Sequence, residues 1–141
     1  MKLKDKPLAS FEIDVQWGDM DSMRHVNNII YLKWVESARL NLFKKIIDHK
    51  IIHNIEISPI LAWQDIKYIR PIVYPDKIKV TYDIIKIEDD RLHGRAEIYS
   101  INQNKLMAIS DNILKAFNTV SFKKEMIPEK WKKIIIDYYS N

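Results

Sequence analysis

The chain has 141 residues and a formal net charge of +4, with 47% hydrophobic and 30% charged residues, a composition typical of one folded globular domain spanning 1–141. It contains no cysteine, which excludes disulfides and thiolate metal sites. We expect a cytoplasmic protein, because the lysine-rich N-terminus is unlike a signal peptide and no apolar run reaches the roughly 18 residues of a membrane span. The positive charge is typical of a solvated surface, and it could also attract nucleic acid, anionic lipid or a phosphorylated small molecule.

The first two predicted elements are a strand and a long helix. Apolar residues alternate with polar ones from Phe11 to Trp17, which predicts a strand with Val15 and Trp17 on one face. From Asn28 to about Ile47 the apolar spacing becomes helical. The apolar stripe of this helix consists of Tyr31, Val35, Ala38, Leu42 and Ile46, widened by Leu32, Trp34 and Phe43. We therefore expect the helix to be deeply buried.

The rest of the chain returns to a period of two. It predicts four strands, at Ile60–Ile69, Lys77–Ile87, Leu92–Ile101 and Leu106–Phe117, after an irregular connection over 49–58. A short C-terminal helix is expected to begin near Pro128, because proline is favoured at a first helical position. This order of elements predicts an α+β fold in which an antiparallel sheet packs against one main helix.

The segment 17–28, WGDMDSMRHVNN, places short polar side chains directly before the long helix. A helix N-terminus carries unpaired N–H groups and partial positive charge. In a structural interpretation, Asn27 or Asn28 caps the helix and the aspartates are stabilised by the same field. In a catalytic interpretation, a free N–H polarises a carbonyl group while a nearby carboxylate attacks it or deprotonates a water molecule. Spacing alone leaves both interpretations open.

The stretch from Val15 to Phe43, VQWGDMDSMRHVNNIIYLKWVESARLNLF, resembles the hotdog-fold acyl-CoA thioesterases of the 4-hydroxybenzoyl-CoA thioesterase family. The shared pattern is an aromatic residue and Gly, then Asp-x-Asp, His-Val-Asn-Asn, Tyr-Leu and Glu-x-Ala-Arg. Two weaker similarities follow, in DIKYIRPIVYPDKI at 65–78 and MIPE at 126–129. The resemblance spans nearly the whole chain.

The resemblance implies a fold, an assembly and a reaction. The fold is an antiparallel sheet wrapped around a long central helix, and the assembly is a homodimer or homotetramer with active sites at the dimer interface. The reaction is hydrolysis of an acyl-CoA without a cofactor or a metal. The catalytic carboxylate of the family falls on Asp21, as nucleophile or general base. The amide that polarises the thioester carbonyl falls on the backbone N–H of Asn28.

The sequence departs from the family pattern at three positions. Arg24 stands where glycine is common, so it could present a cation to the substrate. Asn28 replaces the Tyr or His of several members, which leaves a role for its backbone amide. Pro75 replaces a glycine that often precedes the aspartate at Asp76, and its effect is expected to be confined to a turn.

Other polar residues near the motif have supporting roles. We expect Asp19 to be an acceptor that stabilises the loop. His25 either orients water or binds substrate, or it is a structural hydrogen-bonding residue. Asn27 is expected to cap the helix, with substrate contact as the alternative. Tyr31 is a further candidate for substrate binding.

On the helix itself, Glu36 and Arg39 lie three residues apart and are expected to form a buried pair. The alternative is that Glu36 takes part in substrate binding or catalysis. Several residues elsewhere are weaker candidates. His49, His53 and His93 lack metal-ligand spacing and are expected at the surface, Trp63 and Tyr68 are expected to be packing residues, and Arg70, Lys86 and Arg95 are candidates for contacts with the phosphates of coenzyme A.

Three functions are compatible with these sequence features. The first is an acyl-CoA thioesterase, the second is a thioesterase for acyl groups on acyl carrier protein, and the third is a non-catalytic hotdog protein that binds acyl-CoA. A hotdog hydratase is disfavoured, because that chemistry resembles an Asp with a His five positions later, whereas Asp21 and His25 are four apart. Nucleic-acid binding is not expected, since it would rest on charge alone.

Overall fold

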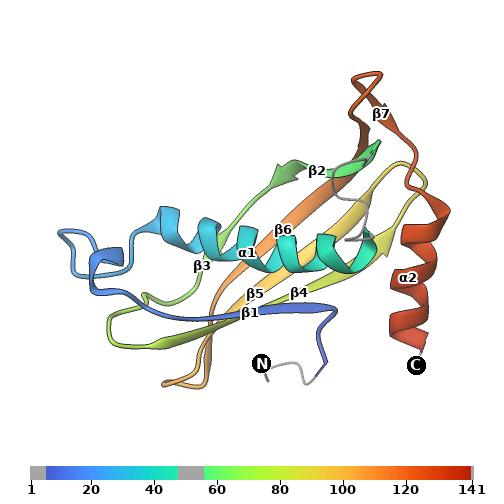
Figure 1. Cartoon of the computed structure of the whole chain (residues 1–141). Helices are drawn as coiled ribbons and strands as arrows, with labels where there is room; N and C mark the ends of the chain where they lie inside the picture. The colour runs from blue at the N-terminus through green and yellow to red at the C-terminus, as the bar shows by residue number, and fades with distance from the viewer. Residues whose placement is uncertain (1–5, 48–55, 141) are drawn as a thin grey trace.

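A computed structural model of the chain describes residues 6–47 and 56–140. Figure 1 shows a curled antiparallel sheet with the long helix α1 lying across one of its faces and the shorter helix α2 at one end. Over these residues the sheet has seven strands, in which β1-β4-β5-β6-β2 are consecutive neighbours and β3 and β7 each pair with β6. This is the α+β hotdog arrangement that the sequence predicts. Within the described ranges, no helix is both long and apolar enough to cross a membrane.

The bounds of the elements follow the predicted order with several differences. The strands are β1 (Ala9–Asp14), β2 (Ile57–Gln64), β3 (Lys67–Tyr68), β4 (Lys77–Ile87), β5 (Leu92–Ser100), β6 (Lys105–Asn118) and β7 (Lys123–Glu125). A short 3₁₀ helix, η1, covers Trp17–Asp19, and the two α-helices are α1 (Asn28–Ile46) and α2 (Glu129–Ser140). The predicted limits of β4 are confirmed, and those of β5, β6 and α1 agree within one residue.

Helix α1 buries the predicted stripe and leaves its other side in solvent. Tyr31, Val35, Ala38, Leu42 and Ile46 are all buried. They recur every three to four residues, which keeps them on the side of the helix that faces the sheet. The expectation that the whole helix is buried is wrong, because Ile29 is 71% exposed and Leu40 is 48% exposed. Ile29 and Leu40 therefore lie on the open side of the helix, whereas Trp34, which widens the stripe, is buried.

Two predicted strands end earlier than expected. The first strand stops at Asp14, and Trp17 lies in η1 with 74% of its surface exposed, because reciprocal hydrogen bonds between Gln16 and Asp19 turn the chain out of the sheet. The strand predicted over Ile60–Ile69 is divided into β2 and β3. Between β2 and β3, Oδ1 of Asp65 accepts the N–H of Asp111 at 2.9 Å. This side-chain oxygen takes the place of a backbone carbonyl in the pairing with β6.

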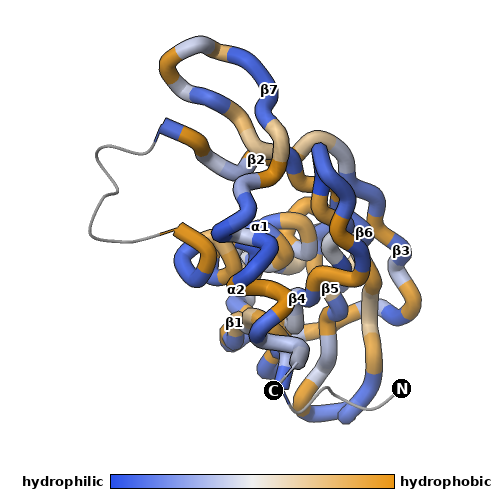
Figure 2. The backbone as a smooth tube through the Cα atoms, turned by 90° about the vertical axis from the view of Figure 1, so that its right-hand side faces the viewer, coloured by the Kyte–Doolittle hydropathy of each residue, from blue (hydrophilic) through white to orange (hydrophobic). Residues whose placement is uncertain are grey.

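The core lies between α1 and the concave face of the sheet. On β4 it includes Ile78, Val80 and Tyr82, and on β6 it includes Leu114 and Ala116. Figure 2, coloured by hydropathy, shows how apolar and polar residues alternate along the strands. The opposite face of β4 is also partly covered: Asp83 is buried, and its Oδ1 accepts hydrogen bonds from Leu8 N–H and from the hydroxyl of Tyr139 on α2.

Candidate active site

The loop between β1 and α1 is held together by its own polar groups. Oδ2 of Asp19 accepts the N–H of Gln16 at 2.8 Å, and the Asp19 carbonyl accepts the N–H of Asn27 at 2.9 Å. Met20 and Val26 form an isolated antiparallel bridge. These contacts confirm Asp19 as an acceptor that stabilises the loop. They also close residues 21–25 into a compact turn at the entrance to α1.

Asp21 stands at the start of this turn with its side chain exposed. Its N–H donates to the carbonyl of His25 at 3.0 Å, and its own carbonyl accepts the N–H of Arg24 at 3.0 Å. Oδ1 accepts the N–H of Met23 at 2.9 Å, which is the pattern of an Asx turn. Among the residues that the structure describes, Oδ2 has no hydrogen-bond partner. One carboxylate oxygen therefore shapes the loop, and the other can meet a substrate or a water molecule.

Arg24 adopts a backbone conformation that favours glycine. Its φ angle is 64°, in the left-handed region that glycine adopts without a steric cost. The side chain is exposed and lines the same hollow as Asp21. The structure therefore leaves the guanidinium available to an anionic group.

The N-terminus of α1 is capped, and one of its backbone N–H groups stays free. The side-chain oxygen of Asn27 accepts the N–H of Ile29 at 2.9 Å, and the Asn27 carbonyl accepts the N–H of Ile30 at 2.9 Å. Asn27 is therefore the N-cap, as predicted. The N–H of Asn28 has no acceptor within the described part of the chain. Because it belongs to the first residue of the helix, it lies where the helix dipole is most positive.

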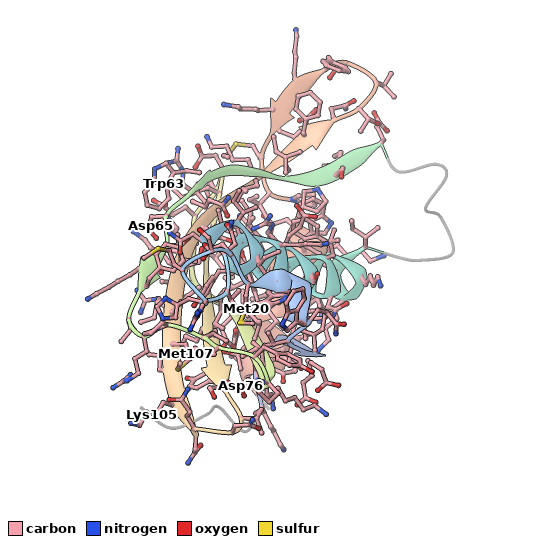
Figure 3. The ribbon with its side chains drawn as sticks, turned by 90° about the vertical axis from the view of Figure 1, so that its left-hand side faces the viewer. Met20, Trp63, Asp65, Asp76, Lys105 and Met107 are labelled. Carbon is pink, nitrogen blue, oxygen red and sulfur yellow. The ribbon has the colours of Figure 1, made fainter. Side chains whose placement is uncertain are left out.

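Asp21 and Asn28 line two different hollows of the single chain. Asp21 shares a hollow of about 440 Å³ with Trp17, Met20, Arg24 and Val73. Asn28 shares one of about 260 Å³ with seven other residues, which are His25, Val26, Tyr31, Tyr68, Ile69, Arg70 and Pro71. In Figure 3, Met20 lies among the loop side chains, whereas Trp63 and Asp65 lie together at the end of β2. The turn 21–25 contributes to both hollows.

Aromatic side chains form the wall beside Asn28. The hydroxyl of Tyr68 donates to the Asn28 carbonyl at 3.1 Å, and its ring meets that of Tyr31 edge-on with centroids 5.0 Å apart. The Tyr31 hydroxyl accepts the N–H of Ile72 at 3.0 Å, and burial raises the pKa of this phenol. The sequence predicted Tyr68 as a packing residue. The structure also gives it a role in fixing the start of α1.

The expected buried pair of Glu36 and Arg39 is wrong. Glu36 is exposed on α1, whereas Arg39 is buried and donates from Nη1 to Oδ1 of Asn112 on β6 at 3.0 Å. The same oxygen accepts the hydroxyl of Tyr82 at 2.8 Å. Arg39 faces the sheet because its position continues the buried side of the helix, while Glu36 lies on the open side. Glu36 is therefore exposed to solvent, and it lines neither the pocket beside Asp21 nor the pocket beside Asn28.

The remaining candidates lie apart from the loop. His93 contacts Oε2 of Glu88 at 2.5 Å, Lys86 pairs with Glu88, and Arg95 pairs with Asp111. Of the three cations considered for phosphate contacts, only Arg70 lines the hollow beside Asn28. Trp63 is half-exposed on β2 and is not a core residue. His49 and His53 lie outside the described residues.

Comparisons with known proteins concern the family and the fold of the chain. A family model described as the thioesterase-like superfamily matches residues 15–135. No curated protein matches the sequence.

Solved structures share the fold at low sequence identity. A thioesterase from Thermus thermophilus, complexed with coenzyme A and Zn, has a TM-score of 0.82 and 20% identity, covering 98% of each chain. A DHNA-CoA thioesterase from Staphylococcus aureus has a TM-score of 0.79 and 20% identity, over 94% of this chain and 91% of the other. A 1,4-dihydroxy-2-naphthoyl-CoA thioesterase from Synechocystis has a TM-score of 0.77 and 20% identity, over 92% and 96%.

Proposed function

The chain belongs to the thioesterase-like superfamily, and on that premise we propose that it hydrolyses the thioester bond of an acyl-CoA. The observation that carries the proposal is the free N–H of Asn28 at the start of α1, directly after the loop that exposes the carboxylate of Asp21. The structure of the Thermus thermophilus thioesterase contains coenzyme A, which supports coenzyme A as the thiol of the substrate.

The Asn28 amide acts on the carbonyl oxygen of the substrate. As the carbonyl carbon becomes tetrahedral, negative charge develops on this oxygen, and a fixed N–H donor stabilises the charge. Asn27 makes this donor available, because it satisfies the N–H groups of Ile29 and Ile30 and leaves that of Asn28 free. The dipole of α1 adds to the effect.

The Asp21 carboxylate acts on the carbonyl carbon. As a nucleophile it would form a mixed anhydride and release the thiolate, after which water would hydrolyse the anhydride. As a general base it would take a proton from the attacking water. Both routes give the free acid and coenzyme A. His25 is the candidate for orienting water, and Arg24 and Arg70 are the candidate cations for the coenzyme A phosphates.

The proposed assembly is a homodimer, or a pair of dimers, with the active sites between protomers. It is supported by the division of the site in one chain, where Asp21 and Asn28 line separate pockets. It is also supported by the exposed apolar residues around the loop, Trp17, Met23 and Ile29, which are each more than 70% exposed.

The substitution Asp21→Asn tests the reaction. The amide oxygen of asparagine can still accept the N–H of Met23, so the turn is expected to stay folded. Thiol release from a panel of acyl-CoAs is expected to fall by roughly a hundred- to ten-thousand-fold, the range typical of a lost acid–base group. Circular dichroism checks the fold of the variant.

The matched control is Asp19→Asn, which changes an acid in the same loop that accepts a hydrogen bond from Gln16. It is expected to retain activity. Equal rates for wild type and Asp21→Asn would reject the assignment of Asp21. If the wild type releases no thiol from any acyl-CoA, the panel is repeated with acyl carrier protein thioesters, and continued inactivity would favour a binding protein.

A further inference from the structure

The hairpin that joins β6 to β7 exposes large apolar side chains away from the candidate active site. Val120 is 80% exposed and Phe122 is 78% exposed. Figure 1 shows this hairpin rising beyond the sheet, at the opposite end of β2 from the loop before α1. Figure 2 shows apolar residues in its turn. A projecting turn with two such side chains in water is unfavourable unless something covers it.

The turn is built to hold these side chains outward. Oδ1 of Asn118 accepts the N–H groups of Val120 and Ser121, both at 2.9 Å, and the Asn118 carbonyl accepts the N–H of Phe122 at 2.9 Å. Phe122 has a φ angle of 62°, which is rare for a bulky side chain. Its ring meets Phe117 edge-on, with centroids 5.2 Å apart. The hydrogen bonds of Asn118 therefore hold Phe122 in a conformation that is unfavourable for its side chain.

Charged residues lie beside the turn of this hairpin and determine which kind of partner it can bind. Lys123 and Lys124 follow Phe122 directly, are exposed, and have no acidic partner within the described residues. Two acids at the base of the hairpin, Glu56 and Glu125, accept hydrogen bonds from Nδ2 of Asn118. The loop before α1 and the first turn of α1 expose Met23 and Ile29 to a similar degree, but this loop carries Asp19 and Asp21 as well as Arg24. The two adjacent lysines of the hairpin therefore have no counterpart at the other apolar end of the molecule.

The cationic surface continues from the hairpin onto the outer face of the sheet. Lys124 lines a hollow of about 310 Å³ together with the half-exposed Trp63, Ile113, Arg91 and Lys115. Asp90 pairs with Arg91 and Lys115 there and offsets part of the charge. Aromatic and lysine side chains side by side are typical of segments that lie at a lipid–water interface.

We propose that the β6–β7 hairpin docks on an anionic lipid surface. Val120 and Phe122 enter the boundary between headgroups and acyl chains, and Lys123 and Lys124 meet the lipid phosphates. The fold of the chain stays outside the bilayer, and the loop before α1, at the other end of β2, stays in water. The inference is independent of the proposed hydrolysis.

Co-sedimentation of the full chain with vesicles tests the inference. Vesicles of phosphatidylcholine alone are compared with vesicles that also contain phosphatidylglycerol, at low and at raised salt. The wild type is expected to bind only the anionic vesicles, and more weakly in salt. Lys123→Gln with Lys124→Gln is expected to weaken binding roughly thirtyfold, from the known contribution of each lysine near an anionic surface. Val120→Ser with Phe122→Asn is expected to weaken it about tenfold or more.

The matched control is Ile85→Ser with Ile136→Ser, which removes two apolar residues, 53% and 52% exposed on β4 and α2, outside both the hairpin and the proposed dimer interface, and is expected to bind vesicles like the wild type. Asparagine is chosen at position 122 because it tolerates the positive φ angle. Circular dichroism and thermal unfolding show whether each variant is folded. No binding by the wild type, or wild-type binding by the folded hairpin variants, would overturn the inference and leave a protein as the partner of this hairpin.

Discussion

At the scale of single residues, short polar side chains combine structural and chemical roles in the loop before α1. Asn27 satisfies two backbone donors and thereby leaves the N–H of Asn28 free. Asp21 uses one carboxylate oxygen to order the turn and keeps the other open. Capping and oxyanion stabilisation rely on the same unpaired groups of a helix terminus, so the structural and catalytic interpretations of the motif are compatible.

Arg24 gives a prediction at this scale. Its φ angle of 64° is unfavourable for a side chain with a Cβ atom, so Arg24→Gly is expected to raise the free energy of unfolding by about 1 kcal/mol in urea denaturation. Asn104→Gly is the control: its φ angle is 52°, but asparagine tolerates this region, and little change is expected. A loss of stability in Arg24→Gly would mean that the guanidinium stabilises the loop.

At the scale of elements, α1 is tied to the sheet by a buried polar contact as well as by apolar packing. Oδ1 of Asn112 on β6 accepts from both Arg39 on α1 and Tyr82 on β4, and Nδ2 of Asn112 donates to Ser110. Burial raises the pKa of Tyr82, so its hydroxyl keeps its proton and remains a donor. One amide therefore joins three elements of the core.

The substitution Asn112→Ala tests this contact. It leaves the buried cation of Arg39 and the hydroxyl of Tyr82 without their acceptor, and the expected loss in the free energy of unfolding is about 3 kcal/mol. Asn112→Asp keeps an acceptor and adds a charge that complements Arg39, so it is expected to lose less. Chemical denaturation of the three proteins gives the comparison. Equal losses would show that packing volume, and not the acceptor, is what matters at this position.

At the scale of the whole molecule, one edge strand of the sheet has no charged side chains. β2 is an edge strand, and its eight residues, ISPILAWQ, contain no Lys, Arg, Asp or Glu. Exposed edges usually carry charges or other features that prevent pairing, and here Pro59 is the one residue of β2 that removes a main-chain donor. Such an edge favours pairing with a second copy, in line with the proposed homodimer.

The corresponding prediction concerns thermal unfolding. If a second copy covers β2, the unfolding midpoint is expected to rise with protein concentration, because dissociation accompanies unfolding. Calorimetry over a hundredfold range of concentration measures this, and sedimentation at the same concentrations reports the mass. A midpoint that stays constant, with the mass of a single chain, would contradict the proposed dimer.

The sequence by itself determined the features that depend on local spacing. The limits of β4, the buried stripe of α1 and the cap at Asn27 follow from periodicity and side-chain chemistry within a few residues, and a family resemblance pointed to Asp21 and Asn28. Only the tertiary structure decided which distant groups meet. Arg39 meets Asn112, 73 residues away, in place of Glu36, and Tyr68 meets Asn28 across 40 residues. The exit of Trp17 from the sheet, the division at Asp65 and the three-residue strand β7 depend on strand register and turn geometry, which a local pattern does not encode because packing against the rest of the chain selects them.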